Sequence, residues 1–294
     1  MTLRIATRGS VLARWQAERV ATRLGGDAEL VIVTTTGDAR PDTPIAAMGG
    51  TGVFVKEVEQ AVLDGRADMA VHSAKDLPST PPPAGLVLAA FPERADPRDA
   101  LVGSTLAGLR PGAVVASGSI RRRAQLAAVH AELEFAELRG SITTRLEKAA
   151  QFDAIVVAAA ALERLGMLDR ADEVLEPTVM MPQVGQGALA VECRAGDDAT
   201  ATRLAAIDDA PTARAVTAER AFLAGLAGGC DLPCGALATV DDDRIVLQGV
   251  LAAPDGSHIV RHVAEGTDPG EVGARLLAEM LDHGGRDLLE ASGP

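Results

Sequence analysis

The sequence predicts an α/β protein that ends in a smaller α+β region. Up to about residue 208, short apolar runs typical of strands alternate with runs whose apolar residues recur at helical spacing. Such alternation is typical of parallel sheets joined by helices. From about Asp209 the order changes to a helix, a cysteine-containing loop, short strands and a last helix. The 294 residues, 47% of them apolar, suffice for two or three domains with a sizeable core.

The first region is predicted to open with a strand over residues 3–7. Arg8-Gly9-Ser10 then turns the chain into a helix, for which Ser10 is the N-cap and which Gly25 and Gly26 end. Further strands are predicted over residues 30–34, 68–71 and 86–91, a loop over 35–38, a helix over 53–63 and a crossing to the next domain over 92–99.

The second region repeats the alternation, and Ser119 and Ser141 are predicted to cap two of its helices. Its strands are predicted over residues 113–117, 133–137 and 154–158, followed by a helix that ends near Gly166 and by a run, 188–193, that returns to the first sheet. The third region is predicted to hold a helix over 216–226, strands over 236–240, 245–251 and 259–263, and a helix over 271–282. The predicted domains are therefore residues 1–96 with 187–207, residues 100–183, and residues 209–294.

Composition narrows the classes of function. A formal net charge of -13 and only 2% aromatic residues argue against a nucleic-acid partner and against an acidic membrane surface. No signal peptide is found, and no apolar run reaches the ~18 residues that a membrane span needs. Three cysteines indicate a reducing compartment rather than a disulfide framework. We predict a cytoplasmic protein, monomeric because no long apolar surface stripe is left over, with no metal site and no nucleotide loop.

Arginines stand where helix dipoles disfavour cations. Arg8 precedes the Ser10 cap, the run Arg121–Arg123 fills the first turn after Ser119, and Arg139 and Arg145 flank Ser141. An arginine beside the free N–H groups of a helix start is typical of a carboxylate or phosphate site, and arginine favours planar carboxylates. For a single arginine the alternative is solvated surface charge; three such helix starts together predict a polyanionic ligand.

Two loops carry candidate chemistry. The stretch His72–Asp76 follows a strand, where open α/β sheets place their sites. Asp76 is a candidate general acid/base or stabiliser of a cation, with Lys75 as its partner or a substrate contact; the alternative is a surface ion pair. His72 is interpreted as a structural residue rather than a catalyst. In the glycine-rich loop 228–235, Cys230 is a candidate for covalent attachment, and the alternative is a small apolar loop residue.

Taken together, the motifs resemble those of the porphobilinogen deaminase family, in the family's order over nearly the whole chain. The matching stretches are Ala6–Ser10, Gly52–Glu57, Ala70–Asp76, Asp96–Ala100, Gly118–Arg122, Leu138–Gly140, Thr144–Leu146, Val184–Ala188 and Gly228–Cys230.

The resemblance implies two periplasmic-binding-protein-like α/β domains plus a smaller α+β C-terminal domain. It also implies a dipyrromethane cofactor joined to Cys230 by a thioether, and a small-molecule substrate, porphobilinogen, four units of which are joined head to tail with loss of ammonia before water releases hydroxymethylbilane. Carried over position by position, it makes Asp76 catalytic. The residues that it implies for cofactor binding are Cys230, Lys75, Ser73, Ser119, Arg121, Arg122 and Gln186. Those that it implies for substrate binding are Arg8, Ser10, Arg139, Arg145, Arg164 and Phe54.

The sequence also departs from the family. Thr51 replaces the lysine of the family's Gly-Gly-Lys-Gly loop, Ser141 replaces an asparagine, and Cys234 stands where an aliphatic residue is usual. Cys193 is interpreted as a buried strand residue. Two further hypotheses stay open at this stage: a non-catalytic binding protein for an organic polyanion, and a thiol-dependent acyl or redox enzyme, although no base is placed beside Cys230 by the sequence.

Overall fold

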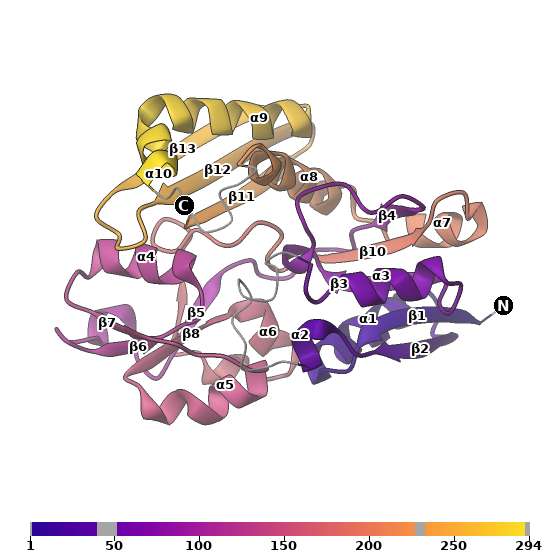
Figure 1. The fold of residues 1–294 in the computed structure, drawn as a ribbon, viewed down its shortest axis with the longest axis horizontal. Helices are drawn as coiled ribbons and strands as arrows, with labels where there is room; N and C mark the ends of the chain where they lie inside the picture. The colour runs from indigo at the N-terminus through magenta and orange to yellow at the C-terminus, as the bar shows by residue number, and fades with distance from the viewer. Residues whose placement is uncertain (1, 40–51, 227–232, 292–294) are drawn as a thin grey trace. The chain divides into compact units, whose positions relative to one another are not determined.

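The computed structural model describes residues 2–39, 52–226 and 233–291 (Figure 1). The chain divides into two compact units. Unit 1 comprises Met1–Ala95 with Gly187–Ala213, and unit 2 comprises Asp96–Gln186 with Arg214–Pro294. Along the chain, the strands of two five-stranded sheets alternate with helices, and a three-stranded sheet follows. The predicted α/β class with a smaller C-terminal region is therefore confirmed. The three-domain division stays a prediction.

Unit 1 is built on a five-stranded sheet of order β2-β1-β3-β10-β4. Its elements are β1 (Leu3–Arg8), α1 (Val11–Arg23), β2 (Ala28–Val33), α2 (Thr36–Ala39), α3 (Lys56–Leu63), β3 (Met69–Ser73), the 3-10 turn η2 (Ala74–Asp76), β4 (Leu86–Ala90), β10 (Leu189–Arg194) and α7 (Asp198–Ala205). The predicted loop 35–38 is in part the short helix α2, and α7 was not predicted.

The prediction of parallel sheets is right for only some of the strand pairs. Strand β1 is parallel to β2 and β3, but β10 runs antiparallel to both β3 and β4. The chain re-enters this sheet at Leu189, directly opposite Ser73 at the end of β3. Because no crossover helix first carries the chain back to the other edge, β10 can only run the opposite way. The predicted return of this segment to the first sheet is confirmed.

Both faces of this sheet are covered by helices. Ala17 and Val20 of α1 pack with Ile5 and Met69 on one face, and Val58 of α3 belongs to the apolar cluster on the other. Ser10 caps α1 as predicted, since its side chain accepts a hydrogen bond from the backbone N–H of Ala13. Burial on both faces explains why the strands read as continuous apolar runs.

Unit 2 opens with a second five-stranded sheet, of order β7-β6-β8-β5-β9. Its elements are β5 (Asp99–Val102), η3 (Leu106–Gly108), β6 (Val114–Ala116), α4 (Ile120–Val129), β7 (Glu134–Ala136), α5 (Ile142–Lys148), η4 (Ala149–Gln151), β8 (Ala154–Ala158), α6 (Ala159–Arg164), η5 (Leu168–Arg170) and β9 (Glu173–Leu175). Helices α4 and α5 lie on opposite faces of the sheet (Figure 1). Here too β5 is antiparallel to its neighbours β8 and β9.

The two predicted serine caps in unit 2 differ. Ser141 caps α5 as expected, with its Oγ 3.2 Å from the backbone nitrogen of Thr144. Ser119 occupies the N-cap position of α4 as predicted, but its side chain makes no capping hydrogen bond. The predicted position is therefore right and the predicted capping interaction is wrong. Instead, the backbone N–H of Ser119 donates to Oγ of Ser117. The Ser119 hydroxyl is therefore not used by its own helix.

The C-terminal part of unit 2 is an antiparallel sheet packed against helices. Its elements are α8 (Ala210–Gly225, of which residues from Arg214 on belong to unit 2), β11 (Cys234–Asp241), β12 (Arg244–Ala252), β13 (Ile259–Gly266), α9 (Pro269–Met280), the π-helical turn η6 (Leu281–Gly285) and α10 (Arg286–Ala291). Phe222 of α8 and Leu276 of α9 lie in its apolar core with Leu247 of β12. No helix in the described part of the chain is both long and apolar enough to cross a bilayer.

Candidate active site

Parallel strands in unit 1 bring several predicted residues to one edge of the sheet. Strand β1 ends at Arg8, β2 ends just before the short helix α2 that holds Asp38, and β3 ends at Ser73. Because β1 pairs with β2 and β3 in parallel register, all three carboxyl ends meet at the same edge. The turn η2, which carries Lys75 and Asp76, continues from this edge.

The catalytic candidate, Asp76, is half-buried in a turn that is tied down at both ends. The N–H of Ala74 donates to the carbonyl of Ala188 at 3.0 Å, and the N–H of Leu77 donates back to Ala74. Ser73 lies just before the turn, and its Oγ is 2.9 Å from Nε2 of Gln16, a buried amide on α1. Gln16 was not predicted, although a polar residue on the otherwise apolar face of α1 is a signal that the sequence contains.

His72 fits its interpretation as a structural residue. Its side chain is buried within unit 1, and its Nε2 lies 3.2 Å from Oε2 of the equally buried Glu192 on β10. Glu59 of α3 belongs to the same group, since burial first, and then the charge of Glu192, raise the pKa of Glu59. These groups lie inside unit 1.

Arg8 already has a carboxylate partner within unit 1. Its guanidinium donates from Nε and Nη2 to the two oxygens of Asp38, at 3.0 and 2.5 Å. The same guanidinium lies over the ring of Phe54, 4.0 Å from the ring centroid. Two of the predicted substrate-binding residues, Arg8 and Phe54, are thus in contact, and Asp38 is an addition that the sequence did not indicate.

In unit 2, Asp99 gathers three of the predicted cofactor-binding residues. This carboxylate is fully buried at the start of β5, opposite Ala158 at the carboxyl end of β8. It accepts hydrogen bonds from Arg121 Nη2 at 2.8 Å, Arg122 Nη2 at 2.7 Å and Nε at 3.0 Å, and Gln186 Nε2 at 2.9 Å. The two arginines are therefore buried ion-pair partners of the chain's own carboxylate, not solvated surface charges.

The charges in this Asp99 cluster do not balance. Burial alone would raise the pKa of Asp99, but the charges of Arg121 and Arg122 outweigh it and hold the pKa far below its ordinary value. One ionised carboxylate faces two guanidinium groups, which leaves one excess positive charge in a buried place. Arg121 Nε is buried and has no hydrogen-bond acceptor among the described residues. A second anion satisfies both the charge and this donor, so the cluster fits a carboxylate-bearing ligand.

The remaining predicted residues of unit 2 lie around the same edge of its sheet. Arg139 follows β7, with its Nε 3.5 Å from Glu137, and Arg145 of α5 donates to the carbonyl of Gly140. Arg164 ends α6, and burial lowers its pKa to about 10, while Glu163 acts in the opposite direction.

The cysteine loop itself is only partly described. Cys230 and Thr51 lie outside the described residues, as do Gly49 and Gly50. Cys193 is buried in β10, as predicted. Cys234, the first residue of β11, is half-buried, and a Cβ on its neighbour Gly235 would lie 3.3 Å from Cδ of Arg121. The strand that leaves the cysteine loop therefore begins beside the Asp99 cluster.

Glu219 on α8 links the flanks of this loop to the segment that carries Gln186. The Glu219 side chain is fully buried and accepts from the N–H of Gly185 at 2.7 Å and from the N–H of Ala238 on β11 at 2.9 Å. Because α8 precedes the cysteine loop and β11 follows it, one carboxylate fixes both flanks relative to residue 185. Glu219 was not predicted, since a lone acid in a helix carries no local signal.

The close approach at Gly235 yields a prediction. A Cβ at this position would lie 2.5 Å from the carbonyl oxygen of Pro182 and 2.9 Å from that of Met181, both backbone atoms that cannot turn away. Gly235→Ala is expected to lower the free energy of unfolding by about 2 kcal/mol, a typical cost of overpacking. Urea unfolding measures it, with Gly9→Ala as the control because a Cβ there makes only an ordinary contact, 3.5 Å from Cγ2 of Ile32. Equal stabilities of the two variants would contradict the prediction.

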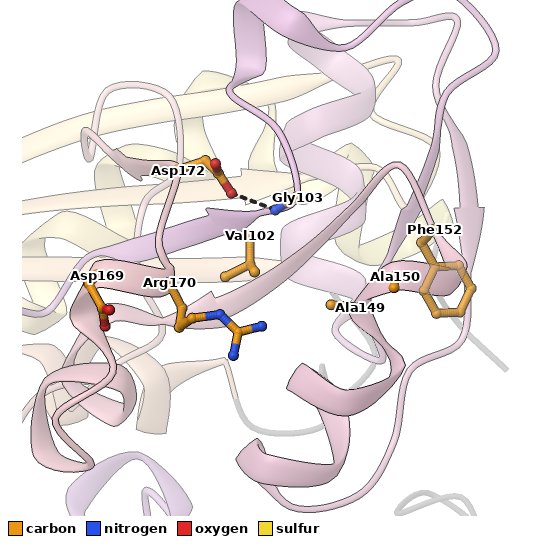
Figure 2. A pocket seen from close by; sticks show the side chains of 8 residues that line it. All are labelled: Val102, Gly103, Ala149, Ala150, Phe152, Asp169, Arg170 and Asp172. Carbon is orange, nitrogen blue, oxygen red and sulfur yellow. Dashed lines mark hydrogen bonds between the residues drawn. The ribbon is translucent and has the colours of Figure 1, made fainter.

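A surface pocket of about 430 Å³ lies elsewhere in unit 2 (Figure 2). It is lined by Val102 at the end of β5, by Phe152 and by Arg170, and the Asp172 carboxylate accepts from the N–H of Gly103. Since β5 runs from Asp99 to Val102, this pocket lies at the opposite edge of the sheet from the Asp99 cluster. It contains none of the predicted residues. The described part of the chain holds no group of acidic, histidine or cysteine side chains suited to a metal ion.

Two family models and several curated relatives match this chain. Residues 3–202 match the family model "Porphobilinogen deaminase, dipyromethane cofactor binding domain", and residues 213–282 match "Porphobilinogen deaminase, C-terminal domain". The porphobilinogen deaminase of Roseiflexus castenholzii is 48% identical over 98% of each chain. That of Brevibacillus brevis is 43% identical over 97% of this chain and 96% of its own. Among solved structures, a Bordetella pertussis solute receptor, DctP7, covers 99% of each chain at 13% identity with a TM-score of 0.36, too low to support an argument.

Proposed function

The chain belongs to the porphobilinogen deaminase family, and from this premise we propose that it is a hydroxymethylbilane synthase of tetrapyrrole biosynthesis. It joins four porphobilinogen molecules head to tail onto a covalently bound dipyrromethane cofactor and then releases hydroxymethylbilane by hydrolysis. The family is one of transferases, so the chain is an enzyme. Membership rules out both the non-catalytic binding protein and the thiol-dependent acyl or redox enzyme. A monomeric state and a cytoplasmic location stay predictions.

The observation that best supports the proposal is that a cationic and an anionic side chain, Arg8 and Asp76, lie at the same edge of the unit 1 sheet. Arg8, at the end of β1, suits a substrate carboxylate, and Asp76, just after the neighbouring strand β3, suits a developing cation. Porphobilinogen brings both: an acetate and a propionate, and a pyrrole that becomes positively charged as ammonia leaves. The same edge therefore supplies an anchor for the substrate and a counter-charge for its reaction.

In each addition the bond between the methylene carbon and the amine nitrogen breaks and ammonia departs. That carbon forms a new bond to the α-carbon of the acceptor pyrrole, which loses a proton. We assign to the Asp76 carboxylate the stabilisation of the cation through its pyrrole N–H and help with proton movement. The hydrogen bond between Gln16 and the Ser73 hydroxyl holds the end of β3, from which this turn continues. We assign Lys75 to contact with the cofactor.

The Asp99 cluster is assigned to the cofactor. When bound, dipyrromethane supplies the terminal pyrrole to which the first substrate is joined, and it carries carboxylates of its own. The excess positive charge and the unused Nε of Arg121 match a carboxylate there, with Arg122 and Gln186 held in place by Asp99 and with Ser119 nearby. Arg139, Arg145 and Arg164 are assigned, with Arg8, Ser10 and Phe54, to substrate carboxylates and the growing chain.

The test of the covalent link is a mass measurement. We expect intact-protein mass to exceed the sequence mass by two linked pyrrole units, located on Cys230. Trypsin cleaves after Arg220 and Arg244, so Cys230 and Cys234 lie on one peptide. Comparing Cys230→Ser with Cys234→Ser resolves them, because only the first substitution should abolish the added mass.

The outcomes of the mass measurement separate cleanly. An adduct that persists in Cys230→Ser would refute the assigned attachment site. A wild-type chain that is unmodified, stays unmodified after incubation with porphobilinogen and forms no product would refute the proposed function. A chain that is unmodified at first but gains the mass on incubation supports it, as an apo preparation.

A further inference from the structure

The Arg8–Asp38 pair has the geometry of ligand recognition. Two donors of one guanidinium meet the two oxygens of one carboxylate, the fork-to-fork arrangement by which arginine recognises carboxylates in general. The hydroxyl of Thr35 adds a third donor, 2.8 Å from Asp38 Oδ2. Asp38 therefore occupies the same donors that a substrate carboxylate would need.

The Arg8–Asp38 pair is more exposed to solvent than the Asp99 cluster. The side chains of Arg8 and Asp38 are 23% and 25% exposed, whereas the Asp99 side chain is 0% exposed. Burial alone would raise the pKa of Asp38, but hydrogen bonds from Arg8 and Thr35 outweigh it and keep the pKa below its usual value. Asp38 is thus an ionised competitor at neutral pH, and partly exposed ion pairs are weak enough to exchange.

Phe54 holds Arg8 independently of Asp38. The guanidinium carbon lies 4.0 Å from the centroid of the Phe54 ring, so the ring supports the cation from one face. The Phe54 ring also packs against helix α2, which carries Asp38, since a Cβ on Gly37 would lie 2.1 Å from Cε1 of Phe54. Arg8 can therefore keep its place while its carboxylate partner changes.

We propose that Asp38 is a specificity-determining residue, an internal carboxylate that occupies Arg8 until an acetate or propionate of porphobilinogen displaces it. This inference rests on the proposed function, which assigns Arg8 to substrate carboxylates. The exchange replaces one carboxylate by another, so Arg8 never loses its counter-charge. A ligand without a carboxylate gains nothing at Arg8, because it cannot replace the pair that it breaks. The internal competitor also lowers the apparent affinity by the fraction of sites it occupies.

The variant Asp38→Asn tests the proposal, since it keeps the shape of the side chain and removes its charge. We expect the KM for porphobilinogen to fall about two- to fivefold, the range that the weakness of exposed pairs allows. The control is Glu93→Gln, which removes the same charge from another arginine–carboxylate pair in unit 1, with Arg23 at 3.0 Å. Its KM should match that of the wild type, which excludes a general effect of net charge on an anionic substrate.

A readout without turnover repeats the test. Calorimetry with a pyrrole that carries both carboxylates but lacks the aminomethyl group should show the same gain in affinity for Asp38→Asn and for Asp38→Ala. In the Arg8→Leu background, Asp38→Asn should change neither affinity nor KM, because the two residues act through one contact.

Each contrary result has a distinct meaning. If Asp38→Asn raises the KM, Asp38 positions Arg8 rather than competing for it, and the inference is overturned. If Arg8→Leu raises the KM but neither Asp38 variant lowers it, the inference fails while the proposed function stands. If Arg8→Leu leaves both KM and binding unchanged, the assignment of Arg8 fails and the inference fails with it.

Discussion

Asp76→Asn is expected to reduce kcat about 10²- to 10⁴-fold, the usual share of a positioned acid, base or counter-charge. Asparagine keeps the size of the side chain but cannot neutralise a cation or accept a proton. The turn that carries residue 76 is held by backbone hydrogen bonds from Ala74 and Leu77, not by the carboxylate. The fold and the mass added to Cys230 should therefore survive the substitution, and Asp76→Ala should behave in the same way.

Steady-state turnover of porphobilinogen, with intact mass to confirm cofactor loading, measures this effect. Asp64→Asn is the matched control, because Asp64 is an exposed acid of the same unit, next to Gln60 and Arg66. A loaded Asp76→Asn enzyme with kcat within about threefold of the control would remove Asp76 from the catalytic role. An unloaded variant would instead show that Asp76 serves cofactor assembly, again against the role assigned here.

Asp99→Ala is expected to destabilise the protein by about 3–5 kcal/mol, the cost of leaving buried charges without their partner. Asp99 is the only carboxylate that either Arg121 or Arg122 is seen to contact among the described residues. Its removal leaves two guanidinium groups buried with carbonyl acceptors alone. Urea unfolding measures the loss, and Asp169→Ala, at an exposed acid of the same unit, should cost less than about 0.5 kcal/mol.

The ion pairs of Asp99 with Arg121 and Arg122 also predict how the free energy of unfolding depends on pH. Because the pKa of Asp99 is lower in the folded protein than its ordinary value of about 3.9, the folded state holds the charged form more firmly than the unfolded chain does. This stability is present above pH ~4 and is lost as the pH falls through the folded pKa. The free energy of unfolding should thus fall less steeply below pH ~4 in Asp99→Asn than in wild type. If the free energy of unfolding fell equally steeply with pH in both proteins below pH ~4, the assigned ion pair would be contradicted.

The elements that the sequence predicted well are those with local signals. Ser10 and Ser141 cap their helices, as polar residues ahead of periodic apolar runs indicate. Strand β3, predicted over residues 68–71 and observed over Met69–Ser73, was recognised from a short apolar run. Strands β5 and β9 were not predicted; both are short, and β5 begins at Asp99, the last residue of the stretch interpreted as a crossing between domains. The antiparallel course of β10 was missed because direction depends on where the chain re-enters the sheet.

The arginines show what local sequence patterns could not predict. From Arg121 and Arg122 the sequence alone predicted carboxylate partners, because guanidinium chemistry at a helix start favours them. It determined the kind of partner, the residues at the ends of parallel strands, and the family motifs in their order. Only the tertiary structure decided that the first carboxylate these arginines meet is Asp99, that Arg8 meets Asp38, and that Glu219 joins Gly185 to β11. Such contacts join residues 19–34 positions apart. They are set by sheet register and packing between elements, which no local periodicity encodes.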